Sequence, residues 1–190
     1  MKNRVKAGAT LLALILCVSL FAGALAENGA PIAENLELTT YRGVSMGGRL
    51  SAVDPEGDAV IFEICTPPSK GTIELGDDGS FVYTPGEGRK GKDYFGYRAI
   101  DTDGNCSQEA TVIIRIQKQK TKTTYSDMDG RAEAYAAVLL AENGIFVGEK
   151  LAGRYVFRPD EPVTRGEFLA MCMELTDTEL LTGTLSTGFA

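Results

Sequence analysis

Acidic side chains in two stretches of the sequence are the residues best suited to bind a metal ion. Asp54, Glu56 and Asp58 occur at every second position, and Asp101 and Asp103 repeat that spacing further along. Calcium prefers carboxylate oxygens as ligands, so these five residues form a candidate Ca²⁺ site. Calcium is the only cofactor that the sequence indicates. The alternative is ordinary turn chemistry, because Asp, Asn and Gly are the commonest loop residues.

A second candidate site is an arginine at the start of a predicted helix. Thr164 is suited to be the N-cap, and Glu167, three residues later, can complete a capping box. Arg165 then lies in the first helical turn beside free backbone N–H groups, where it could bind a carboxylate. The alternative is that Arg165 is a solvated helix residue. Gly166 weakens the helix start by up to about 1 kcal/mol relative to alanine.

Catalytic chemistry is not indicated by the residue types present. The chain contains no histidine, so a serine or cysteine nucleophile would lack its usual base. The acidic pairs fall in predicted turns, with no sign of an apolar cleft that would shift their pKa values. We therefore expect a protein that is not an enzyme within these 190 residues.

The N-terminal stretch predicts export. Residues 1–26 combine three basic residues, an apolar run at 11–20 and small residues before a cleavage site after Ala26. We interpret them as a signal peptide, because the apolar run is too short for a stable membrane span. Cleavage would move the formal net charge from −7 to −10. Such a surface repels nucleic acid and anionic lipid, and an acidic polymer would need a local basic site.

Residues 30–117 have the pattern of an all-β sandwich. Short apolar or alternating runs are separated by Gly, Pro and Asp clusters, and Asp77-Asp78-Gly79 is typical of a hairpin turn. About seven strands in this length favour an immunoglobulin-like fold, whose topology would place the two acidic stretches at the same end. The predicted strands are 36–40, 48–53, 59–65, 72–75, 81–84, 94–100 and 110–116.

Three cysteines remain after the predicted signal peptide, and an odd number does not form a disulfide framework. Cys65 is expected to end a strand and Cys106 to lie in a loop at the opposite end of the sandwich. A disulfide needs Cα atoms within about 7 Å, so we expect free residues, with a Cys65–Cys106 bridge as the alternative. Cys172 is the third.

The remaining residues have a different composition. Residues 118–124 are polar and basic, which is typical of a linker. Residues 125–177 predict a small helical unit with one helix near 131–143, a stop at Asn143-Gly144, a long loop, and a second helix from Thr164. A unit of this size buries little surface and would be marginally stable alone.

The order of motifs in the β half resembles the bacterial cadherin-like, immunoglobulin-like modules of large surface proteins. That resemblance implies a spacer or adhesive role, and some such modules are stiffened by calcium. The motifs are Asp54-Pro55-Glu56-Gly57-Asp58, Pro68-Ser69-Lys70-Gly71-Thr72, Gly79-Ser80-Phe81-Val82-Tyr83-Thr84-Pro85, Gly91-Lys92-Asp93-Tyr94-Phe95-Gly96-Tyr97 and Asp101-Thr102-Asp103-Gly104-Asn105.

The helical half resembles an S-layer homology repeat. The resemblance implies binding to a pyruvylated secondary cell wall polysaccharide, with Arg165 contacting the glycan and Thr164 and Gly166 beside it. The motifs are Tyr125-Ser126-Asp127, Leu140-Ala141-Glu142-Asn143-Gly144-Ile145, Phe157-Arg158-Pro159-Asp160 and Val163-Thr164-Arg165-Gly166-Glu167-Phe168.

Two departures from the repeat leave its activity open. The chain has no tryptophan, and Ala132 stands where the family usually has one; Gly166 replaces the usual alanine. The repeat could therefore be structural instead of ligand-binding. Residues 178–190 resemble a tail running into a second repeat at Thr187-Gly188-Phe189-Ala190, so we expect a truncated chain.

Together these features predict a secreted protein of the cell wall or cell surface, attached through the S-layer homology unit. Its partners would be the wall polymer and further S-layer homology repeats or tandem modules, with no nucleic acid and no membrane. Two alternatives remain: the accessory region of a larger exported enzyme whose catalytic domain lies elsewhere, and a calcium-dependent adhesion module.

Overall fold

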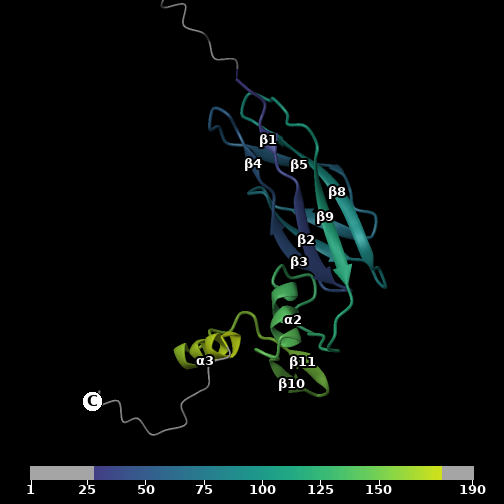
Figure 1. Ribbon diagram of the computed structural model, residues 1–190, viewed down its shortest axis with the longest axis vertical. Helices are drawn as coiled ribbons and strands as arrows, with labels where there is room; N and C mark the ends of the chain where they lie inside the picture. Colours follow the sequence, from purple (N-terminus) through teal and green to yellow (C-terminus); the bar gives the residue numbers. More distant parts are fainter. Residues whose placement is uncertain (1–27, 177–190) are drawn as a thin grey trace, which may run out of the picture.

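The computed structural model describes residues 28–176; the predicted signal peptide and the tail expected at 178–190 lie outside the described residues. Strands dominate the first part of the chain, and short helices follow (Figure 1). The strands of this first part are β1 (Ile32–Ala33), β2 (Leu36–Tyr41), β3 (Met46–Arg49), β4 (Ala52–Val53), β5 (Ile61–Thr66), β6 (Gly71–Leu75), β7 (Ser80–Pro85), β8 (Gly91–Ile100) and β9 (Ala110–Gln117).

Two sheets form the predicted sandwich. One has the order β2-β9-β8-β5 and the other β3-β7-β6, while β1 and β4 pair as a short separate ribbon. The pairing of β2 with β9 is parallel, so the first long strand lies beside the last one of the module. The predicted strand at 48–53 is divided: β3 pairs with β7, whereas β4 pairs with β1. The other six predicted strands are confirmed with small changes at their ends.

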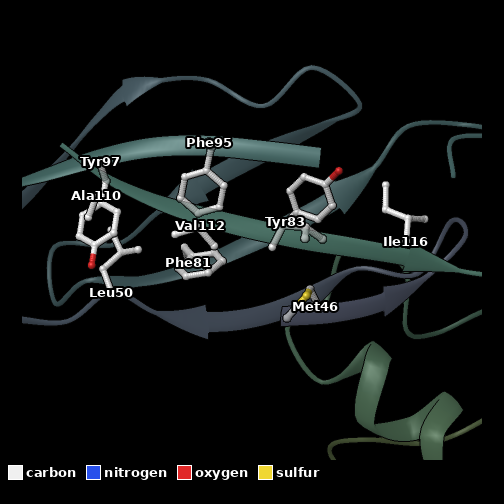
Figure 2. Close-up of a cluster of buried hydrophobic side chains, with 10 residues drawn as sticks. Met46, Leu50, Phe81, Tyr83, Phe95, Tyr97, Ala110, Val112 and Ile116 are labelled. Atoms are coloured by element: carbon white, nitrogen blue, oxygen red, sulfur yellow. The ribbon is translucent and has the colours of Figure 1, made fainter. Parts of the chain in front are cut away.

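The hydrophobic core lies between the two sheets (Figure 2). Alternate residues of β9 point inward, as the period-two pattern predicts for a strand with one buried face. Phe81 and Phe95 meet edge to face with ring centroids 5.4 Å apart. The buried members are Met46, Leu50, Phe81, Tyr83, Phe95, Tyr97, Ala110, Val112, Ile114 and Ile116.

One carboxylate is buried at the edge of this core. Asp93 is 1 % exposed, and its oxygens accept hydrogen bonds from the Tyr83 hydroxyl (2.8 Å), from the Ser69 N–H and hydroxyl (3.0 Å each), and from the Lys70 N–H (2.9 Å). Burial by itself raises the pKa of Asp93, but these donors lower it more, so the net pKa lies below the usual value. Asp93 thereby fixes the loop between β5 and β6 against β8.

The helical half contains α2 (Ala134–Glu142), a hairpin of β10 (Glu149–Leu151) and β11 (Arg154–Val156), and α3 (Arg165–Leu175). The two predicted helices are present, and Gly144 follows α2 with a φ of 73°, as a left-handed stop requires. The hairpin replaces what the sequence predicts as a loop. Ala152 and Gly153 both have positive φ (48° and 82°) at its turn. Alanine rarely adopts positive φ, so the sequence contains no indication of a hairpin turn here.

The helical unit packs on one end of the sandwich (Figure 1). Val44, in the turn after β2, is buried with Tyr125, Met128 and the inner face of α2. The Tyr41 and Tyr135 ring centroids lie 5.5 Å apart across this junction. The unit therefore shares a small core with the sandwich.

Residues 118–124, interpreted as a linker, are also held in place. The Glu142 carboxylate at the end of α2 accepts hydrogen bonds from the Lys120 N–H (2.7 Å) and the Thr121 N–H (2.6 Å), and also from the Thr121 hydroxyl. Thr123 is buried. The connection between the two parts is thus fixed by contacts, although the domain boundaries themselves stay a prediction.

The last helix has the opposite character, because none of its residues is buried. Three of its large apolar side chains are exposed, with Phe168 60 % exposed and Leu169 and Leu175 similarly so. Within residues 28–176, neither helix has the length and apolar character needed to cross a bilayer.

The cysteines do not lie at opposite ends as the sequence reasoning expected. Cys65 occupies a bulge of β5 beside Gly96 and Tyr97 of β8, and Cys106 pairs with Ile100 at the end of the same strand. Both thiols are exposed and free, and β8 runs between them. Partial desolvation raises the pKa of the Cys65 thiol.

We expect Asp93→Asn to lower the free energy of unfolding at pH 7 by about 2–3 kcal/mol. The amide of asparagine would place its own N–H₂ donor opposite some of the N–H and O–H groups whose hydrogen bonds the carboxylate accepts. The folded pKa of Asp93 lies below the unfolded value of about 3.9. Its stabilisation is therefore complete above that value and is lost as the pH falls through the folded pKa. Urea unfolding between pH 7 and pH 2 measures both effects.

The exposed turn residue Asp77 supplies the matched control, since Asp77→Asn should change the free energy of unfolding by less than about 0.5 kcal/mol. A wild-type advantage over Asp93→Asn that stayed constant down to pH 2 would contradict the role given to this carboxylate.

Candidate functional site

The two acidic stretches lie at the same end of the sandwich, on either side of the dipeptide Asn28-Gly29. The Asn28 side-chain amide donates to Asp101 Oδ2 (3.3 Å) and Asp103 Oδ2 (2.7 Å). The Gly29 N–H donates to Glu56 Oε2 (3.0 Å). The chain just before β1 therefore connects the two turns that the sequence pattern selected.

Each turn is organised by its first aspartate. Asp54 Oδ1 accepts from the N–H groups of Glu56 (3.1 Å) and Asp58 (3.0 Å). Asp101 Oδ1 accepts in the same way from the residues two and four positions later, at 2.9 and 2.8 Å. Burial by itself raises the pKa of Asp101, but its hydrogen bonds, above all those from Asn105, lower the pKa below its usual range. The turn chemistry that was the alternative to calcium binding is thus present in both stretches.

Two oxygens at this end, Asn28 Oδ1 and Asp54 Oδ2, are buried and have no hydrogen-bond partner among residues 28–176. Unpartnered buried oxygens are costly and few in folded proteins. Asp54 is only 9 % exposed, whereas Glu56, Asp58 and Asp103 are exposed.

Among residues 28–176 no three His, Cys, Asp or Glu side chains come close enough to hold a metal ion. The five predicted carboxylates therefore do not form one cluster in this arrangement. Sequence reasoning also missed Asn28, a polar residue four positions before the first strand.

The predicted capping box at α3 is confirmed. The Glu167 N–H donates to Thr164 Oγ1 (3.2 Å), and the Thr164 N–H donates to Glu167 Oε2 (2.8 Å). Arg165 is the first residue of the helix, exposed, and forms no ion pair with the described residues. A Cβ added at Gly166 would meet nothing within 4 Å, so the space there does not require glycine.

The loop before α3 is held by Asp127. Its carboxylate accepts from the Phe157 N–H (3.0 and 3.1 Å) and from the Arg158 N–H (2.7 Å). Burial by itself raises the pKa of Asp127, but the two backbone donors lower it more, and the net pKa lies below its usual value. Arg158 has a φ of 60°, a conformation uncommon for a residue other than glycine. Asp127 stabilises this loop conformation through both N–H groups.

Ion pairs and aromatic contacts also hold the loop at 157–161. Arg158 contacts Glu149 (2.8 Å) and Glu161 (3.0 Å), and Arg131 binds Asp160 through two nitrogens. These pairs are exposed and each adds little stability, about 0–1 kcal/mol. The Phe157 ring meets those of Tyr125 and Phe146 edge to face, each at 5.4 Å. Two of the four sequence blocks selected in this half, 125–127 and 157–160, thus meet at one loop.

A cavity of about 210 Å³ lies between this loop and α3. Neither Thr164, Arg165 nor Gly166 lines it. Its charged lining residues are three glutamates and one arginine, Glu149, Glu161, Glu167 and Arg158. An acidic lining of this kind does not favour an anionic ligand.

Comparisons with known proteins support the class of the β half. Residues 28–118 match the family of the bacterial cadherin-like domain. This match supports the prediction of a cadherin-like, immunoglobulin-like module in this part of the chain. The comparisons do not identify an S-layer homology repeat, which stays a prediction.

Curated protein sequences gave no match to this chain. Among solved structures, the endo-fucoidan hydrolase MfFcnA4 of glycoside hydrolase family 107 is similar at 24 % identity over 49 % of this chain and 14 % of that one, with a TM-score of 0.39. A mutant of the SrpA adhesin from Streptococcus sanguinis is 17 % identical over 54 % of this chain and 63 % of its own, with a TM-score of 0.37. The D00-D0 domain of intimin is 15 % identical over 50 % of this chain and 50 % of its own, with a TM-score of 0.34.

We expect Asp127→Asn to release the loop at Phe157 and Arg158. An amide can still accept one N–H but would turn its own N–H₂ toward the other, so amide exchange at Phe157 and Arg158 should become about tenfold faster or more. Hydrogen exchange followed by mass spectrometry measures this. Asp129→Asn changes an exposed neighbour of the same charge and should leave the exchange rates unaltered. Equal exchange rates at Phe157 and Arg158 in the two variants would contradict the role given to Asp127.

Proposed function

We propose that the protein is a noncatalytic exported surface protein. The cadherin-like module serves as a spacer or adhesion unit, and the helical unit attaches it to an anionic, pyruvylated secondary polymer of the cell wall. The observation that carries this proposal is the assembly of the repeat-like blocks into one unit, with Asp127 holding the loop that leads into the capped start of α3.

The junction between the two parts favours a spacer. Val44 and Tyr41 of the sandwich pack against the helical unit, and Glu142 fixes the connecting residues. Because these contacts join the parts through a shared core, the module would hold a defined direction relative to its anchor.

The exposed face of α3 supports an anchor built from more than one repeat. Phe168, Leu169 and Leu175 are large apolar side chains that the described residues leave uncovered. Further S-layer homology repeats, which the resemblance implies as partners, would cover such a face. In this proposal the glycan contact at Arg165 depends on that assembly.

Retention on purified wall sacculi tests the attachment. If Arg165 binds a carboxylate of the polymer, Arg165→Ala should weaken retention about tenfold, since a hydrogen bond to a charged group contributes about 1.5–3 kcal/mol. Arg89→Ala removes an equally exposed arginine from the sandwich and should be retained like the native protein. Equal retention of Arg165→Ala would remove this arginine from the mechanism, and failure of the native chain to bind would reject the attachment itself.

A second candidate function is calcium-dependent adhesion or stiffening, favoured by the unpartnered oxygens Asn28 Oδ1 and Asp54 Oδ2. The residues that would hold the ion are Asn28, Asp101 and Asp103, since the Asn28 amide lies within 3.3 Å of both carboxylates. The donor chemistry fits, because all three offer side-chain oxygens to a hard cation. The Asn28 amide now presents its N–H₂ to the carboxylates, and it would have to present its oxygen instead.

Addition of Ca²⁺ at about one hundred times its dissociation constant should stabilise the protein by about 2.7 kcal/mol, which raises Tm by several degrees. Asp103→Asn should weaken this rise, because Asp103 is exposed and contacts Asn28 without organising its own turn. Asp77→Asn is the control. Calorimetric titration with no heat, together with an unchanged Tm of the native chain, would exclude calcium.

A further inference from the structure

A groove of about 680 Å³ lies between residues 121–126 and the β10–β11 hairpin. Its size falls in the range of small-molecule and oligosaccharide sites. None of the residues proposed to bind polymer or calcium lines it. Six of its lining residues carry the argument: Lys122, Lys150, Arg154, Thr124, Ser126 and Tyr155.

Both walls of the groove are fixed by hydrogen bonds. The Ser126 N–H donates to the Tyr155 carbonyl (3.0 Å), and the Ser126 hydroxyl lies 3.3 Å from the same oxygen. Tyr125 pairs with Tyr155 as an isolated parallel bridge, and the Tyr125 hydroxyl donates to the Val147 carbonyl (3.1 Å). At the other end of this wall, Thr121 is held by Glu142. The groove is therefore largely preformed.

The charge of the groove is unusual for this protein. Lys122, Lys150 and Arg154 line it, and no carboxylate does. None of the three forms an ion pair with the described residues, whereas five arginines elsewhere in the chain do: Arg49, Arg98, Arg115, Arg131 and Arg158. The Lys150 ammonium instead lies 5.4 Å from the centre of the Tyr155 ring. Three cations gathered without a counter-charge repel one another, and an anion would relieve that repulsion.

The uncharged lining narrows the class of anion. Thr124 and Ser126 are exposed and offer hydroxyls, and the half-buried Tyr155 offers part of a ring. Hydroxyls and an aromatic surface beside separated cations suit a sugar chain that carries carboxylates along its length. Nucleic acid is disfavoured by the net charge of −7, which repels a long polyanion everywhere outside the groove.

We infer that this groove binds an anionic polysaccharide segment and is the principal polymer site of the chain. The inference rests on the proposed function, since it takes the wall polymer as the ligand. It assigns the main contact to Lys122, Lys150 and Arg154 and not to the helix start at Arg165. The acidic lining of the cavity beside α3 agrees with that assignment.

The test uses the full chain and oligogalacturonate, whose sugars each carry a carboxylate, in calcium-free buffer, with neutral dextran as the reference probe. Lys122→Gln combined with Arg154→Gln should weaken oligogalacturonate binding about tenfold for each charge removed. Arg89→Gln combined with Lys90→Gln makes the same change of net charge on the exposed β7–β8 turn and should bind like the native protein. Affinities come from calorimetry at two salt concentrations, and chemical shifts of Lys150 and Arg154 side chains locate the contact.

The outcomes separate this inference from the proposed function. Tight oligogalacturonate binding by the groove variant, or chemical-shift changes confined to Arg165 and its neighbours, would reject the groove as the polymer site. Wall attachment would still stand in that case if sacculi retain the native chain. Loss of binding in the groove variant alone, with its Tm unchanged, would support the groove. If the native chain binds oligogalacturonate through the groove but is not retained by sacculi, the wall polymer is rejected as the ligand and the inference about it falls with the proposed function.

Discussion

Val44, in the turn between β2 and β3, is the point at which the two parts of the chain depend on each other. Its side chain is buried among residues of the helical unit, and Tyr135 of α2 packs against both hydrophobic cores. Close by, the Gly47 N–H donates to the Ala132 carbonyl (2.8 Å), and a Cβ at Gly47 would lie 2.8 Å from that of Ala132. A unit of about fifty residues buries too little surface to be stable alone, so it uses the end of the sandwich to complete its core.

This shared core positions everything that follows it. Tyr125 is buried in the same cluster, and the residues beside it, Ser126 and Asp127, bind the hairpin and the loop before α3. The groove wall at 121–126 and the loop before α3 are thus both positioned on the sandwich through one short segment. The helix α3 itself lacks such support, since none of its residues is buried. A change at Val44 or Gly47 would therefore affect the groove wall and this loop without altering a residue of either.

Sequence patterns predicted the features that depend on residues close together in the chain. Alternation located the strands of the sandwich, and the Thr164–Glu167 spacing predicted a capping box that the structure contains. The β10–β11 hairpin was missed because Ala152 takes positive φ without the Asn-Gly signal of such turns. Asn28, the position of Cys106 and the contacts of Glu142 were missed because they arise only when distant segments meet. Composition suggested a linker at 118–124, but composition carries no information about a carboxylate more than twenty residues away.

Overall composition is equally silent about local charge, so an acidic chain can still carry the site that we propose for an acidic polymer. Net charge acts over distances comparable to the Debye length, about 8–10 Å at physiological salt, and beyond that it is screened. Within that distance the local arrangement decides, and it differs between two hollows. Glutamates dominate the charged lining beside α3, whereas the charged residues that line the groove at the hairpin, within the described part of the chain, are all cations. The arginine selected from the sequence stands at a helix start with no described hollow around it. Lys122, Lys150 and Arg154 carry no motif, but folding brings them together, and that gathering makes the stronger physical case for an anion.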